Sequence, residues 1–179
     1  FGQLGEPEPV LGGAVQRAPA RLIGAWSVRF LVTPPDRQAP GWTPLWSGSG
    51  GVIWSNPDWL PEIRVAGGAH SLGEGAGWRR LKGEGLDFAS EAVVPEGTAV
   101  IRADNTAFDV IETSGTKIRG TAACDGSCLV VVARPWAPGW RAEVDGEASP
   151  IVRANLAGLG VVVPPGEHRV ELSYNPWRW

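Results

Sequence analysis

Hydrophobic and polar residues alternate over short stretches in the second half of the chain. The stretch WRAEVD at 140–145 alternates strictly between apolar and polar positions. Because successive side chains of a strand point to opposite faces of a sheet, this pattern predicts a half-buried strand. Asp145 and Gly146 then supply the positive backbone angles of a tight turn, so we expect a hairpin there.

The same alternation, interrupted by glycine and proline, continues from residue 86 towards the C-terminus. The predicted strands are 86–93, 98–104, 107–113, 116–123, 128–134, 140–145, 150–154, 158–163 and 167–174. The stretch LVVVA at 129–133 has no polar alternation, which predicts a central strand covered on both faces. This many short strands over residues 86–176 indicates a β-sandwich or jelly roll of the kind found in carbohydrate-binding modules.

The N-terminal part of the chain has a different pattern. Residues 1–20 are expected to form an irregular lead-in, and residues 21–66 a small α+β appendage. Within the appendage, we expect strands near 26–33 and 52–54 and one helical turn over 56–61. Residues 67–85 are rich in glycine and charge and are interpreted as a connector loop. The predicted fold class is therefore all-β, with this appendage at the N-terminus.

Composition narrows the class of protein. The 179 residues suit one domain with a smaller appendage, and the 25 glycines and 16 prolines suit short strands. The net charge is -3, and the 16 basic residues are scattered singly, which argues against a nucleic-acid partner. No apolar run is long enough to cross a bilayer. Because the chain also lacks methionine, we expect it to be a piece of a longer protein.

The two cysteines lie close together in the segment CDGSC. A tight turn there would bring Cys124 and Cys128 within bridging distance, and a disulfide favours an oxidising, extracytoplasmic compartment. Two free buried thiols are an alternative. A metal site is a poorer one, since His70 and His168 are the only histidines and the cysteine spacing does not suit zinc.

Several segments resemble one family. The ordered pieces RPWAPGWRAEVDG and ANLAGLGVVVPPGEHRVELSYNP resemble the C-terminal signature of the YfhO-type family of bacterial multi-spanning membrane proteins. RLIGAWSVRFLVT and SNPDWLPEIRV are similar to the segments that precede this signature. The resemblance implies a C-terminal extracytoplasmic β domain, anchored to the bacterial cell membrane by transmembrane helices outside this chain. The family usually has an arginine where Glu62 stands, so any anion contact of that arginine is not carried over.

The resemblance also implies an activity for the whole protein. Such proteins are membrane glycosyltransferases that take sugars from polyprenyl-phosphate carriers and decorate cell-envelope polymers, with the catalytic acid on a loop between membrane helices. We therefore expect this chain to be non-catalytic and to use no cofactor. The residues agree, because no nucleophile elbow, phosphate loop or zinc-protease motif is present. A carboxylate pair for glycoside hydrolysis stays open among 19 acidic residues.

The ten tryptophans are the candidates for binding. A tryptophan ring packs equally well in a protein core and against a pyranose. Strand-like positions predict core packing for Trp26, Trp54 and Trp140, whereas Trp59 and other loop-like tryptophans are either lids over the core or sugar platforms. The candidate glycan-binding residues are Trp42, Trp46, Trp78, Trp136, Arg153 and Asn155. Trp177, Arg178 and Trp179 combine aromatic rings with a cation, as at a membrane boundary.

Two functions follow as expectations. The first is the binding or positioning of a cell-envelope glycan or a polyprenyl-phosphate sugar. The second is a purely structural domain that packs on its own transmembrane region or on an assembly partner. His168 and Asp145 are expected to have structural roles at a strand start and a hairpin, and His70 is expected to be solvated.

Overall fold

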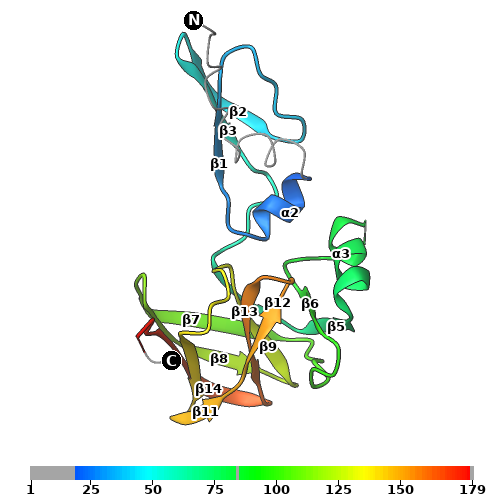
Figure 1. The fold of residues 1–179 in the computed structure, drawn as a ribbon, viewed down its shortest axis with the longest axis vertical. Helices are drawn as coiled ribbons and strands as arrows, with labels where there is room; N and C mark the ends of the chain where they lie inside the picture. The colour runs from blue at the N-terminus through cyan, green and yellow to red at the C-terminus, as the bar shows by residue number, and fades with distance from the viewer. Residues whose placement is uncertain (1–18, 84, 178–179) are drawn as a thin grey trace, which may run out of the picture. The chain divides into compact units, whose positions relative to one another are not determined.

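A computed structural model describes residues 19–83 and 85–177 (Figure 1). The chain divides into two compact units, Phe1–Leu60 and Pro61–Trp179. The predicted appendage extends six residues too far, because β4 (Ile63–Ala66) pairs with β9 (Cys128–Val132) and so belongs to the second unit. The lead-in predicted for residues 1–20 lies almost wholly outside the described residues.

The described part of the N-terminal unit, from residue 19 onwards, contains one short helix and one sheet, an α+β arrangement. These are α2 (Ala20–Gly24), β1 (Phe30–Thr33), β2 (Thr43–Gly48) and β3 (Gly51–Ser55), with the antiparallel strand order β1-β3-β2. One face of the sheet covers a small core that contains Trp42 and Trp54, and the Trp54 indole donates a hydrogen bond to the Thr33 hydroxyl at 2.9 Å.

The helical turn predicted over 56–61 is wrong. Asn56 accepts a hydrogen bond from the Asp58 N–H, which forms a local turn, while its amide nitrogen donates to the carbonyls of Ala20 and Val28. An asparagine side chain that bonds its own backbone favours a turn over a helix. The helix of this unit lies earlier, at Ala20–Gly24, so the predicted strand begins only at Phe30.

The C-terminal unit is a β-sandwich, which confirms the predicted fold class. Its five-stranded sheet has the order β11-β10-β14-β8-β7 and its four-stranded sheet the order β12-β13-β9-β4, with every neighbouring pair antiparallel. The strands not yet introduced are β7 (Thr106–Thr113), β8 (Lys117–Cys124), β10 (Trp140–Val144), β11 (Glu147–Ser149), β12 (Ile151–Ala154), β13 (Gly158–Val163) and β14 (Gly166–Tyr174).

The core between the two sheets consists of inward-facing aliphatic side chains. Ile118 and Leu172 come from the five-stranded sheet, and Val130 and Val161 come from the four-stranded sheet. Each of these side chains is completely buried, which stabilises the fold by roughly 1.5–3 kcal/mol per residue. In β10, the alternation in the sequence also identifies the inward face, because Ala142 is buried in this core whereas Arg141 and Glu143 are exposed.

A third layer covers the other face of the four-stranded sheet. It consists of β5 (Gly68–Leu72), α3 (Glu74–Lys82) and β6 (Glu91–Pro95), and β5 and β6 pair in parallel (Figure 1). Leu129 and Val131 of β9 pack under this layer in a second apolar cluster. The prediction that β9 is covered on both faces is confirmed.

The connector loop predicted for residues 67–85 is wrong, because β5 and α3 occupy it. Gly77 marks close packing instead, because a Cβ atom there would lie 3.1 Å from Val93 and 3.2 Å from Leu156. Two strand predictions also change. The strand expected at 86–93 is β6 at Glu91–Pro95, and the one at 98–104 is reduced to isolated bridges at Arg102.

The turns around the sandwich agree with the sequence in two places. Asp145 and Gly146 have φ angles of 54° and 87°, which confirms the hairpin between β10 and β11, although β11 itself was not predicted. Cys124 and Cys128 form a disulfide. The bond joins the end of β8 in one sheet to the start of β9 in the other, and it excludes free thiols or metal ligation by these cysteines.

Candidate functional site

A cleft of about 290 Å³ opens at the carboxyl ends of the parallel strands β5 and β6. It is lined by Leu72, Gly73, Glu74, Pro95, Glu96, Arg153 and Leu156. Helix α3 begins at the same edge with Glu74. The carboxyl ends of parallel strands, where the connecting helix starts, are the usual ligand-binding edge of such units. The cleft is therefore the candidate site.

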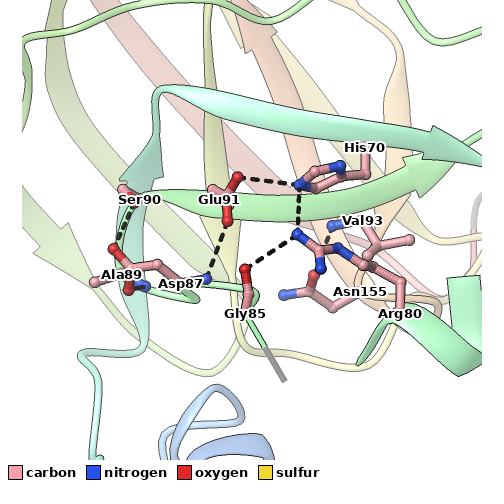
Figure 2. Close-up of polar contacts among 9 residues, drawn as sticks. All are labelled: His70, Arg80, Gly85, Asp87, Ala89, Ser90, Glu91, Val93 and Asn155. Atoms are coloured by element: carbon pink, nitrogen blue, oxygen red, sulfur yellow. Dashed lines mark hydrogen bonds and ion pairs between the residues drawn. The ribbon is translucent and has the colours of Figure 1, made fainter. Parts of the chain in front are cut away.

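The turn after β12 forms one wall of the cleft. The Asn155 N–H donates to the carbonyl of Val93 at 2.7 Å, and the Asn155 side-chain oxygen accepts from the Val93 N–H at 2.9 Å (Figure 2 shows the side-chain bond). Asn155 and Leu156 both have left-handed backbones, with φ of 51° and 72°. Asparagine tolerates this conformation, but leucine is strained in it. The two bonds to β6 hold the turn and place Leu156 in the wall.

Three charged side chains border the cleft. They are Glu74 at the start of α3, Glu96 after β6 and Arg153 on β12. Within the described chain, none of the three makes an ion pair or a side-chain hydrogen bond. Their donors and acceptors are therefore available to a ligand.

Arg153 is held by a tryptophan. Its guanidinium carbon lies 4.4 Å from the centre of the Trp136 ring. The backbone N–H of Trp136 donates to the carbonyl of Ala157 at 2.7 Å, and the ring packs against the sandwich core. Trp136 does not line the cleft itself. The structure thus brings together two predicted site residues, one at the cleft and one beneath it.

The other predicted site residues lie elsewhere. Asn155 is buried and bonds to β6, whereas Trp78 is on α3, outside the cleft lining, with the Lys82 ammonium 5.1 Å from its ring centre. Trp42 and Trp46 belong to the N-terminal unit, the first buried in its core and the second exposed. Trp177 is 90% exposed, and the membrane-boundary prediction for Arg178 and Trp179 falls outside the described residues.

Among the cleft residues that sequence reasoning missed are Leu72, Glu74, Glu96 and Leu156. The interpretation of residues 67–85 as a loop hid the first two. The apolar run AVVP at 92–95 is the signal that was available, because a short run without alternation is typical of a buried parallel strand. A prediction that this segment forms a parallel strand would have directed attention to the carboxyl end of that strand, where the cleft lies.

A polar cluster joins α3 to β6 (Figure 2). His70 lies 3.0 Å from a Glu91 carboxylate oxygen, so it is paired and not simply solvated as the sequence suggested. Arg80 donates to the carbonyl of Gly85 at 3.1 Å, and the Asp87 N–H donates to Glu91 at 3.0 Å. The bond from Asp87 lowers the pKa of Glu91, and His70 adds to the effect. These groups satisfy one another, which makes the cluster structural.

A hollow of about 510 Å³ lies on the outer face of the five-stranded sheet. Two of its three carboxylates already have partners: Asp145 bonds to His168 at 2.7 Å, and Glu171 accepts from Arg119 at 2.9 Å. Glycine and charged residues line it, without an apolar side chain. The smaller cleft beside Arg153 is the better ligand site because its charges are unpaired and its walls are partly apolar.

Comparisons with known proteins support one assignment. The family model described as bacterial membrane protein YfhO matches residues 86–178. No curated protein and no solved structure matches the chain. Among the described residues, no helix combines the length and the hydropathy needed to span a membrane. The family match covers just over half of the 179 residues, and the chain therefore belongs to the YfhO family of bacterial membrane proteins.

Proposed function

We propose that the C-terminal unit is a non-catalytic, extracytoplasmic domain of a membrane-embedded glycosyltransferase that uses polyprenyl-phosphate sugars. In this proposal the domain binds a cell-envelope glycan in the cleft at the ends of β5 and β6. The observation that carries the proposal is the presence, in one cleft, of apolar walls and three charged side chains that make no ion pair or side-chain hydrogen bond within the described residues.

The lining suits a sugar. Hydroxyl groups donate to the carboxylates of Glu74 and Glu96 and accept from the guanidinium of Arg153. The apolar face of a pyranose packs against Leu72 and Leu156. The volume of about 290 Å³ is near the lower limit of ligand pockets, roughly 300 Å³, so the cleft suits a single sugar unit.

The charges favour a neutral sugar over a phosphate. Two carboxylates and one guanidinium border the cleft, and like charges repel in a partly enclosed site. The glycan acceptor is therefore a better ligand for this cleft than the phosphate of a polyprenyl carrier. The disulfide supports an oxidising location, and family membership supports attachment to a membrane protein.

The direct test is an NMR titration of the chain with neutral envelope saccharides and a short-chain polyprenyl-phosphate sugar. We expect saturable shifts of the Arg153 and Trp136 side-chain signals with a neutral saccharide. Arg153→Gln and Glu96→Gln should each weaken binding about tenfold, because each removes charge-assisted hydrogen bonds.

The matched controls are Arg141→Gln and Glu143→Gln on β10. Arg141 is exposed, and neither residue lines the cleft. Both variants should bind saccharide as the unmodified chain does. No response to any saccharide at millimolar concentration, or equal weakening by the control variants, would remove the cleft as a glycan site.

A second function, a structural domain that packs on its own membrane region, is favoured by Trp177. Its side chain is 90% exposed, and tryptophan is enriched where a protein meets the membrane surface. A Trp177→Cys variant distinguishes the two functions. A structural role predicts that a maleimide labels this cysteine in the isolated chain but not in the full-length protein in membranes.

A further inference from the structure

The sheet of the N-terminal unit has an exposed apolar face. The sequences of its strands, FLVT, TPLWSG and GVIWS, contain no charged residue. Val32 pairs with Ile53, and Ile53 pairs with Trp46, so the three side chains form a row across the sheet. Phe30 lies two residues before Val32 and therefore on the same face. Phe30, Val32 and Trp46 are 51%, 68% and 56% exposed.

The opposite face is the one that faces the core. Val52 and Trp54 alternate with Ile53 along β3, and both are buried against Trp42. Since successive side chains alternate between faces, the row with Ile53 points away from this core. The ring of Trp46 lies over Gly48, where a side chain would collide with it, so the indole spreads flat along the strand.

The cation Arg29 borders this face. The guanidinium carbon of Arg29 lies 5.2 Å from the centre of the Phe30 ring and 5.0 Å from that of Trp59. Aromatic and aliphatic side chains beside an arginine, with no carboxylate in the three strands, are typical of surfaces that lie in the headgroup region of a bilayer. The positive charge complements anionic headgroups.

We propose that this face, formed by Phe30, Val32, Leu45, Trp46 and Ile53, docks on the surface of a bilayer that contains anionic phospholipid. Leu45 sits at the bulge in β2 and is also exposed. The family match begins at residue 86, so the N-terminal unit lies outside it, and the proposal depends only on the structure of this unit. It is independent of glycan binding by the cleft.

A bilayer fits this face better than a second copy of the chain. The strands have four, six and five residues, and only alternate side chains point outwards. A stable protein interface uses about 20–30 residues on each side, whereas a few inserted aromatic and aliphatic side chains suffice for reversible attachment to lipid.

The test is flotation of the 179-residue chain with vesicles made of equal parts phosphatidylethanolamine and phosphatidylglycerol. We expect the unmodified chain to float with these vesicles. The double variant Val32→Ser/Trp46→Ser should bind these vesicles at least about tenfold more weakly, because it removes apolar area that lipid would cover. Arg29→Gln should lower the affinity for these vesicles about fivefold and should change the affinity for vesicles of phosphatidylcholine alone only slightly.

The matched control is Val110→Ser/Ile111→Ser, which removes two exposed apolar side chains from β7 of the other unit. It should float like the unmodified chain. Unchanged thermal unfolding of the double variant shows that the sheet is intact. Absence of flotation, or equal flotation of the Val32/Trp46 variant, overturns the proposal. A concentration-dependent dimer that the same variant abolishes also overturns it, in favour of a second copy.

Discussion

The guanidinium of Arg153 stacks on the ring of Trp136, with 4.4 Å from its central carbon to the ring centre. The ring packs on the sandwich core, so the guanidinium at the cleft is held in place by a well-packed side chain. A side chain held in place before binding loses less conformational entropy when a ligand arrives. Trp136 thus acts as a positioning residue, through Arg153.

Removing the ring should weaken glycan binding without removing any residue of the cleft. We expect Trp136→Leu to raise the Kd of a neutral saccharide about fivefold, since the stacking is worth about 1 kcal/mol. Trp136→Phe keeps an aromatic face and should restore most of the affinity. If both variants bind saccharide as tightly as the unmodified chain, the stacking does not position Arg153.

Asn155 should be sensitive to substitution because it combines a buried hydrogen bond with a left-handed backbone. Asn155→Ala leaves the Val93 N–H without its side-chain acceptor and puts alanine in a left-handed conformation that asparagine tolerates better. We expect a loss of about 2–3 kcal/mol in the free energy of unfolding, measured with urea. Asn155→Gly adopts the same backbone without strain and should lose less. Equal losses would show that the backbone conformation does not contribute.

The disulfide should stabilise the C-terminal unit moderately, since it closes a short loop. Replacing both Cys124 and Cys128 by alanine should lower the free energy of unfolding by about 2 kcal/mol, the loop-closure entropy for roughly five residues. A reducing agent should lower the stability of the unmodified chain but not of the double variant. Identical denaturation curves for the oxidised, unmodified chain and the double alanine variant would contradict this expectation.

The pair of Asp145 and His168 should make stability depend on pH. The hydrogen bond to Asp145, and then the one to the Pro165 carbonyl, raises the pKa of His168 above 6.5, while the bond from His168 lowers the pKa of Asp145 below 3.8. The histidine contribution is complete below about pH 6.5 and is lost as the pH rises through the raised pKa. The aspartate contribution is present above about pH 3.8 and is lost as the pH falls through the lowered pKa.

Asp145→Asn tests this window, because asparagine also tolerates the left-handed backbone at this position. The difference in urea midpoint between the unmodified chain and the variant should be largest near pH 5–6 and smaller near pH 9. A difference that does not change between these values would mean that His168 is not charged in the folded protein.

The sandwich could be predicted because its signals are local. Alternation marks β10 and β14, and the Asp145-Gly146 pair marks the hairpin, so each element is encoded within a few residues. The uninterrupted apolar run of β9 likewise showed that both of its faces are covered. The family model matches this same region, residues 86–178.

The cleft could not be predicted because its parts are distant in sequence. Glu74, Glu96 and Arg153 converge only after the parallel pairing of β5 with β6 and the docking of this layer on the sandwich. In the sequence, Gly77 is indistinguishable from a loop glycine, whereas in the fold it allows α3 to approach Val93 closely. Its role depends on a neighbour that no local pattern reveals.

The two hydrogen bonds between Asn155 and Val93 also couple ligand occupancy to local unfolding. They join a wall of the cleft to β6, so local unfolding of the outer layer, formed by β5, α3 and β6, would disrupt the site. By thermodynamic linkage, a ligand that binds only the closed layer must stabilise it, by RT ln(1 + [L]/Kd). Amide hydrogens of β6 would then exchange more slowly as the cleft fills, and the outer layer itself becomes the reporter of binding.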